Sequence, residues 1–142
     1  MVDKILILRK LAELEEYLNH LKEYSSLSLE EYQKNWKAQR IIERTLQILI
    51  EICLDIANHF ISDKHLRVPE SYADSFKILL EAGFIDASLF QQIEKMARFR
   101  NILVHHYDFI DAPIVIGILR KNLDDFILFR DAILKALSYQ AG

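Results

Sequence analysis

Apolar side chains recur at helical spacing along almost the whole chain, and no stretch shows the strict alternation typical of a strand. Between residues 3 and 24 one stripe advances in steps of four and three: Ile7, Leu11, Leu14, Leu18 and Leu21. Because these steps return to the same side of a helix, the segment predicts one amphipathic helix. A break follows at residues 24–27.

A second, longer helix is predicted from Ser28 to about Phe60 or Ile61. Ser28 and Glu31 have the spacing of a capping box, which closes the first turn of a helix. The helix is apolar on most of its circumference, along two stripes and three further isoleucines: Ile42, Leu46, Leu49, Cys53, Ile56 and Phe60; Ile50, Leu54, Ala57 and Ile61; Ile41, Ile48 and Ile52. Such a helix is either central in its own bundle or covered by a partner as well.

The same spacing and the usual helix-end signals predict three further helices: residues 71–82 closed by Gly83, residues from after Asp86 to about His105, and a last helix from Asp111 and Pro113 to about Leu137. The chain has 142 residues, of which 51% are hydrophobic, and this is enough for one core. We therefore predict an all-α fold, an antiparallel up-down bundle of four or five helices that forms a single domain over residues 1–142.

The composition of the chain argues against several classes of site and of protein. Three glycines and one cysteine offer neither a glycine-rich phosphate loop nor an internal disulfide or a cysteine-pair zinc site. No apolar run free of charges is long enough to cross a membrane, and the first residues lack the features of a signal peptide. The expected location is therefore the cytoplasm. A net charge of −3 gives no general attraction to DNA or to an anionic membrane, so any such binding needs a local basic patch.

The long second helix keeps one polar stripe, which consists of Arg40, Arg44, Gln47, Glu51, Asp55, Asn58 and Ser62. The simplest interpretation is a solvated face on which the residues from Arg44 to Asp55 make ordinary surface ion pairs. The alternative interpretation is functional: Glu51 and Asp55 line a polar groove. Spacing alone leaves both open.

One basic segment, residues 95–107, carries three cationic side chains and two histidines but no carboxylate. Within it, Arg100 falls on a helical stripe of core-type residues: Leu89, Ile93, Met96, Leu103 and Tyr107. A charge at such a position needs a partner, because burying it alone is strongly unfavourable. The partner is either a carboxylate, such as Glu51 or Asp55, or an anionic ligand at an interface.

Asn101 and His105 stand one helical turn apart, so the amide can orient the imidazole ring. Arginine can hold a phosphate, histidine can move a proton near neutral pH, and RNA supplies its own 2′-hydroxyl nucleophile. This set therefore suggests phosphodiester chemistry on RNA without a metal or cofactor. On an ideal helix Arg100 and His105 diverge by about 140°, so they converge only if the helix ends there or two chains share a site. An ordinary ion pair and an exposed histidine remain the alternative.

The run Arg100-Asn101-x-x-x-His105-x-Tyr107 resembles the R-x4–6-H motif of the HEPN superfamily, in the form typical of HepT-like toxins. Residues 54–59 and 69–79 resemble the second and third helices of that family, so the resemblance covers most of the chain. It implies a metal-independent endoribonuclease, the toxin of a type VII toxin–antitoxin system. It also implies a homodimer in which two motifs form one composite cleft across the two-fold axis.

The resemblance also implies roles for individual residues. Arg100 and His105 would be catalytic, and Asn101 would support them. Glu51 and Asp55 are expected as further supporting residues from the groove interpretation of the second helix, not from the resemblance.

The motif tyrosine, Tyr107, would accept AMP from a minimal nucleotidyltransferase antitoxin of the MntA type, which silences the RNase. A seven-residue step would place Tyr107 within about 20° of Arg100 on a helix. Some relatives are described instead as non-catalytic, substrate-binding subunits of such nucleotidyltransferases, and this alternative stays open.

Overall fold

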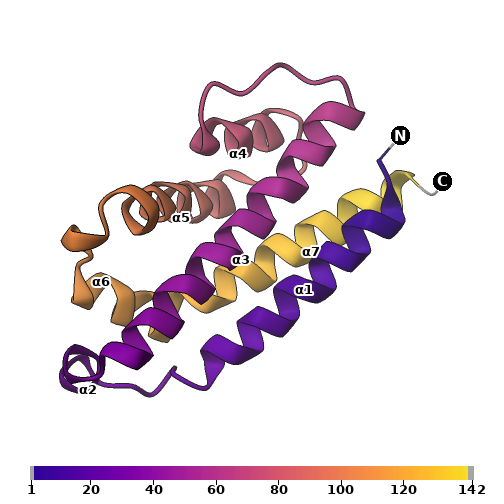
Figure 1. The fold of residues 1–142 in the computed structure, drawn as a ribbon. Helices are drawn as coiled ribbons and strands as arrows, with labels where there is room; N and C mark the ends of the chain where they lie inside the picture. Colours follow the sequence, from indigo (N-terminus) through magenta and orange to yellow (C-terminus); the bar gives the residue numbers. More distant parts are fainter. Residues whose placement is uncertain (1, 141–142) are drawn as a thin grey trace.

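Helices account for most of residues 2–140, the part of the chain that the computed structural model describes, and no strand occurs within it (Figure 1). The α-helices are α1 (Lys4–Lys22), α2 (Leu29–Lys34), α3 (Trp36–Asp63), α4 (Tyr72–Glu81), α5 (Ala87–His105), α6 (Ala112–Gly117) and α7 (Leu123–Gln140). A 3-10 turn at Tyr107–Phe109 follows α5, and a π-helical turn at Ile118–Asn122 joins α6 to α7. The all-α expectation is confirmed.

The bundle is organised around α3. Figure 1 shows α3 crossing the molecule, with α1 and α7 together on one side and α4 and α5 on the other. The helix α1 begins at the end of the bundle where α7 finishes, so these two run antiparallel. Since α3 packs against α1, α4 and α5, it is the element that can bring side chains from all three together.

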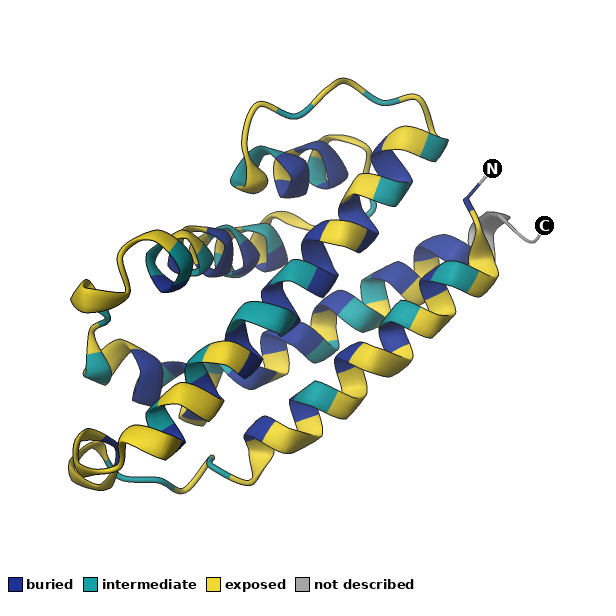
Figure 2. Ribbon diagram, viewed as in Figure 1, coloured by how far each residue is buried: buried dark blue, intermediate teal, exposed yellow. Residues whose placement is uncertain are grey.

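The apolar circumference of α3 is explained by this central position. Both predicted stripes are buried by other helices of the same chain, and Figure 2 shows the buried positions turned toward the neighbouring helices. Of the three further isoleucines, only Ile41 and Ile48 stay at least partly exposed. The bundle itself therefore covers the helix, and its circumference gives no separate reason to expect a partner chain.

By length and composition α3 could also cross a membrane, which the sequence reading did not anticipate. Its most apolar window has a mean hydropathy of 1.2, and 56% of that window is buried within the bundle. The core helix of a soluble protein has the same length and hydropathy. The burial of α3 inside the bundle accounts for its composition without a membrane.

The prediction of one long helix from Ser28 is wrong at a single residue. The capping box is present, with Ser28 Oγ and Glu31 Oε1 each accepting a backbone N–H at 3.1 Å. The helix then breaks at Asn35, whose backbone is extended and whose side chain accepts from the Ala38 N–H at 3.0 Å. Asparagine competes for helix-end backbone groups in this way, so it ends α2 and caps α3.

The end of α4 and both ends of α5 agree with the sequence signals, whereas the last predicted helix is divided. Gly83 has a φ of +81°, the left-handed conformation expected after α4. The helix α5 runs from Ala87 to His105, as predicted. The single last helix is in fact two α-helices joined through the π-helical turn, with Pro113 in the first turn of α6.

Candidate active site

Arg100 lies on the side of α5 that packs against α3 and α4. The stripe that it shares is buried: Met96 is 4% exposed and Leu103 8%. The side chain of Arg100 itself is only 13% exposed. The expectation that this guanidinium occupies a core-like position is therefore confirmed.

The partner of Arg100 is Glu51 of α3. The Nε and Nη2 atoms of Arg100 both donate to Glu51 Oε1, at 3.1 and 2.9 Å. Gln47, one turn earlier on α3, donates to the same oxygen at 3.1 Å. We expected Arg100 to pair either with a carboxylate or with an anionic ligand, and the structure shows the carboxylate. The two hydrogen bonds to one oxygen hold the guanidinium in a defined orientation.

A second group holds the same guanidinium, and sequence reasoning missed it. The ring of Tyr72, the first residue of α4, lies with its centroid 4.6 Å from the central guanidinium carbon of Arg100. This distance is that of a cation–π contact. The sequence shows that an aromatic residue follows the N-cap Ser71. Only the packing of α4 on α5 brings this residue to Arg100.

Two hollows adjoin at Tyr72. The first, of about 510 Å³, is lined by Arg100, Glu51 and Asp55 together with Lys10, Glu13, Ile48, Ile52, Leu54, Asn58 and Tyr72. The second, of about 540 Å³, is lined by Asn101, His105 and His106 together with Asn58, Pro69, Glu70, Ser71, Tyr72 and Ser75. Because α5 stays helical through His105, the two motif residues open onto neighbouring hollows instead of one.

The other predicted supporting residues lie in these hollows but make different contacts. Asp55 lines the hollow of Arg100, yet its ion pair is with Lys10 of α1. Asn101 accepts a hydrogen bond from Arg100 Nη1 at 3.4 Å, and so faces the arginine, whereas we expected it to orient His105. Glu51 and Asp55 thus both line this hollow, and each is also part of an ion pair.

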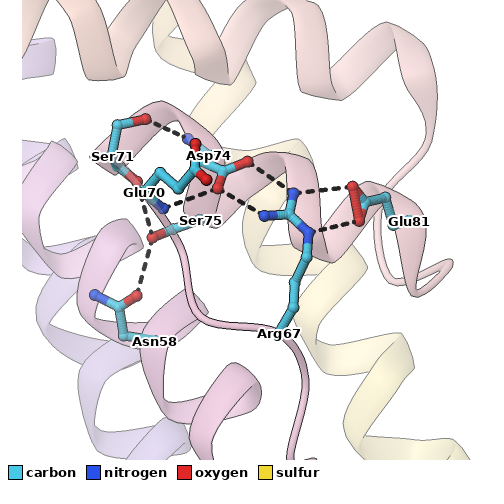
Figure 3. A network of polar contacts seen from close by, with 7 residues as sticks. All are labelled: Asn58, Arg67, Glu70, Ser71, Asp74, Ser75 and Glu81. Carbon is cyan, nitrogen blue, oxygen red and sulfur yellow. Dashed lines mark hydrogen bonds and ion pairs between the residues drawn. The ribbon is translucent and has the colours of Figure 1, made fainter.

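Figure 3 shows the polar network that fixes the loop before α4, and sequence reasoning missed this network also. Arg67 donates two hydrogen bonds of 2.7 Å to Asp74 and two more, of 2.9 and 3.0 Å, to Glu81. These bonds from Arg67 lower the pKa of Asp74 and of Glu81 below their usual values. Asp74 also accepts from the backbone N–H of Glu70 at 2.9 Å.

The same network joins the loop to α3. Ser75 Oγ donates to Asn58 Oδ1 at 3.0 Å, and Ser71 Oγ caps α4 by accepting from the Asp74 N–H at 3.1 Å. Residues 69–71 and Asn58 line the hollow of His105. This Arg67 network therefore holds one wall of that hollow in place. It consists of the seven residues labelled in Figure 3: Asn58, Arg67, Glu70, Ser71, Asp74, Ser75 and Glu81.

Tyr107 lies away from both hollows, so the heptad expectation for it is wrong. The chain leaves the α-helix at His106, whose φ of −137° and ψ of 44° are not helical, and Tyr107 begins a 3-10 turn. It is 66% exposed and lines another hollow, beside Tyr32, Gln39, Arg40 and Glu43. A seven-residue step aligns two side chains only while the helix continues, and here the helix ends first.

The remaining candidates for chemistry are not at this site. Among the described residues, no group of three or more histidine, cysteine, aspartate or glutamate side chains is arranged to hold a metal ion. Cys53 is buried in α3, and this burial raises the pKa of its thiol, so it acts as a small hydrophobic residue. Another hollow, of about 730 Å³, lies between the α4–α5 connection and α7, and none of the motif residues lines it.

The sequence of this chain is similar to those of known ribonucleases. A family model described as Ribonuclease HepT-like matches residues 14–133. An mRNA nuclease HepT of Shewanella oneidensis is 34% identical over 103 residues, which are 72% of this chain and 77% of the relative. A tRNA nuclease HepT of Aphanizomenon flos-aquae is 31% identical over 131 residues, which are 90% of this chain and 87% of the relative.

Solved structures similar to this chain include a protein of the same kind as these sequence relatives. A tri-AMPylated HEPN toxin of Shewanella oneidensis, solved in complex with an MNT antitoxin, superposes with a TM-score of 0.85 and 30% identity. The match covers 95% of this chain and 99% of that toxin chain.

Proposed function

This chain belongs to the HepT-like ribonuclease family, and we propose that it is the endoribonuclease toxin of a toxin–antitoxin pair, acting on RNA in the cytoplasm. Its relatives are named as nucleases of mRNA and of tRNA, and one solved relative is a toxin in complex with its antitoxin. The observation that carries the proposal is the oriented Arg100 guanidinium next to the hollow of His105.

In this proposal Arg100 holds the scissile phosphate. Glu51 engages Nε and Nη2, so the guanidinium cannot rotate freely, and Nη1 lies toward Asn101. Because Asn101 also lines the hollow of His105, Nη1 is on the side from which a phosphate would approach the histidine. An oriented guanidinium stabilises the charge that builds on the phosphoryl oxygens during the reaction.

His105 supplies proton transfer. Its imidazole takes the proton from the 2′-hydroxyl as that oxygen attacks phosphorus, and the bond from phosphorus to the 5′-oxygen breaks. The protonated imidazole then gives this proton to the leaving 5′-oxygen, and the other fragment keeps a 2′,3′-cyclic phosphate. No metal or cofactor is needed in this scheme, because the nucleophile belongs to the RNA.

A homodimer accounts for the offset between the two motif residues. In one chain Arg100 and His105 open onto adjoining hollows, separated by Tyr72 and Asn58. Two copies related by a two-fold axis bring the His105 of one chain toward the Arg100 of the other, and isologous pairs of this kind are the commonest assembly. We infer a composite cleft at that axis, with Asn101, Glu51 and Asp55 as supporting residues.

Tyr107 is the proposed point of control. It is 66% exposed on a turn that follows the motif helix, so a second enzyme can reach its hydroxyl. Transfer of AMP from a minimal nucleotidyltransferase antitoxin of the MntA type would add a phosphate and a bulky nucleoside beside the His105–His106 end of α5. Substrate RNA would then meet both a steric block and like charge.

Expression of this chain alone tests the proposal. We expect growth arrest, relieved by Arg100→Ala or His105→Ala, and a loss of about 10²–10⁴ in cleavage rate for purified His105→Ala. Arg44→Ala is the matched control, because Arg44 is an exposed cation of α3 that lines neither hollow of the motif, and it should arrest growth like the wild type. Absence of arrest and of cleavage would favour a non-catalytic subunit of the nucleotidyltransferase instead.

A further inference from the structure

Tyr72 lies outside the Arg100–His105 motif, yet it lines the boundary between the two hollows of the site. It is 43% exposed at the start of α4, and its ring lies 4.6 Å from the guanidinium carbon of Arg100. It lines both the hollow of Arg100 and the hollow of His105. An aromatic ring that is packed against the phosphate-holding group and still half exposed has free surface at the point where substrate would lie.

Hydrogen bonds fix the start of α4, and with it the backbone that carries the Tyr72 ring. Ser71 caps α4 directly before it, Ser75 binds Asn58 of α3, and the Arg67 network fixes the preceding loop. An immobilised aromatic ring binds a planar ligand at a lower cost in conformational entropy than a mobile one does.

The chemistry of the second hollow fits a nucleobase. Proteins bind single-stranded RNA by stacking its bases on aromatic rings, and every base offers a flat face for this. Beside the ring, the hollow contains the Asn58 and Asn101 amides and the Ser71 hydroxyl, which donate and accept hydrogen bonds as base edges do. An Arg100-bound phosphate would place the neighbouring base within reach of Tyr72.

We propose that Tyr72 is the stacking platform for the nucleobase next to the scissile phosphate, and that the hollow between α4 and the end of α5 is the subsite for that base. The proposal rests on the proposed RNase function and deepens it, because it selects unpaired RNA as the substrate. A base inside a duplex is already stacked on its neighbours and cannot occupy this position.

The test measures binding and stacking separately from cleavage. In a His105→Ala background, which keeps RNA intact, a single-stranded oligonucleotide with 2-aminopurine beside the scissile position should bind with quenched fluorescence. Tyr72→Leu should raise its Kd about five- to hundredfold and abolish the quenching, whereas Tyr72→Phe should keep both. Tyr72→Gln, a second variant without a ring, should repeat the loss if Tyr72→Leu folds poorly.

Trp36→Leu is the matched control. Trp36 is another exposed aromatic residue, at the start of α3 and about 22 Å along the helix from Glu51, so its loss should leave Kd and quenching unchanged. In the cleavage-competent protein, Tyr72→Leu should raise KM more than it lowers kcat.

Three outcomes would overturn the proposal. Unchanged Kd and quenching in both ring-free variants, with normal wild-type cleavage, would refute the role of Tyr72 and leave the RNase function intact. A wild-type chain that neither binds nor cleaves RNA would refute both. Conversion of a wild-type dimer to a monomer by Tyr72→Leu, seen by light scattering, would assign the ring to the contact between two copies.

Discussion

Glu51 and Arg100 are 49 residues apart in sequence, and one carboxylate oxygen of Glu51 accepts two hydrogen bonds from the Arg100 guanidinium. The pair joins the centre of α3 to the last turns of α5, with side chains 37% and 13% exposed. Glu51 engages only Nε and Nη2 of the motif arginine, so a second anion can approach the guanidinium only from the side of Nη1.

Removal of Glu51 should destabilise the fold as well as the site. Glu51→Ala leaves a mostly buried guanidinium without its charged partner, and we expect a loss of about 1–3 kcal/mol in the free energy of unfolding. A double-mutant cycle with Arg100→Met, measured by urea denaturation, should show that most of this loss is shared by the two residues.

Glu15→Ala is the control for this cycle, because Glu15 accepts a hydrogen bond of 3.0 Å from Arg130 but is 51% exposed. It should cost less than about 1 kcal/mol, as exposed ion pairs do. Equal losses for the two glutamates, or no coupling between Glu51 and Arg100, would contradict the proposed positioning.

Cleavage should not depend on a divalent metal. The described residues hold no cluster of metal-binding side chains, and the proposed mechanism uses only Arg100, His105 and the RNA 2′-hydroxyl. We expect full activity in EDTA and products with 2′,3′-cyclic phosphate ends, detected by mass spectrometry of a short cleaved oligonucleotide. Activity that disappears in EDTA and returns with Mg²⁺ would refute this mechanism.

Tyr107→Phe should keep RNase activity and escape the antitoxin. The substitution removes only the hydroxyl that would accept AMP, on a turn that lines neither hollow of the motif. Intact-mass analysis after co-expression with the nucleotidyltransferase should show added AMP on the wild type and none on Tyr107→Phe.

Tyr17→Phe serves as the control for this experiment, since Tyr17 is a partly buried tyrosine of α1, and it should be modified like the wild type. If wild type and Tyr107→Phe carry the same mass of AMP, the acceptor lies elsewhere in the chain.

The composite site should be visible as complementation between inactive chains. Light scattering should find a dimer of about twice the 16.7 kDa chain mass. Arg100→Ala and His105→Ala chains, refolded together, should cleave RNA although neither does so alone, because a mixed dimer has one site with both residues intact. A monomer at micromolar concentration, or no recovery on mixing, would contradict the shared site.

The Arg67 network should make stability depend on pH. The hydrogen bonds from Arg67 lower the pKa values of the Asp74 and Glu81 carboxyl groups below those of the free side chains. A carboxyl group with a lowered folded-state pKa stabilises the fold above its unfolded pKa, and this contribution is lost as the pH falls through the folded value. Arg67→Gln should therefore lower the urea midpoint at pH 7, and the difference from wild type should shrink below about pH 4.

The control for this pH series is Arg98→Gln, because Arg98 makes only an exposed ion pair with Glu94 one turn away on α5. Its midpoint should stay close to that of wild type throughout. A difference between Arg67→Gln and wild type that is the same at pH 7 and pH 3 would show that the network stabilises the loop through packing, without a contribution from charge.

Some structural features could be predicted from the sequence because they depend on residues within one or two helical turns. The Ser28–Glu31 capping box, the left-handed Gly83 and the end of α5 at His105 are of this kind. The helix break at Asn35 is also local, but the hydrophobic pattern did not predict it. In a polar stretch, a capping asparagine has the same hydropathy as any exposed helical residue, so periodicity does not reveal it.

The motif and its need for a charged partner could also be read from the sequence, but the choice of partner could not. Glu51 and Asp55 were equivalent on spacing, and only the packing of α1 against α3, which brings Lys10 to Asp55, leaves Glu51 for Arg100. The contact of Tyr72 with Arg100 could not be predicted either, because it depends on the packing of α4 on α5.

The sequence by itself therefore determined the helices, their buried faces and the Arg100–His105 motif, because hydrophobic periodicity and capping act between near neighbours. Only the tertiary structure decided that Arg100 and His105 open onto separate hollows, and that Tyr107 turns away from both. These relations depend on where α5 ends and on which helices pack against it. Such contacts join residues far apart in the chain, and local spacing carries no information about them.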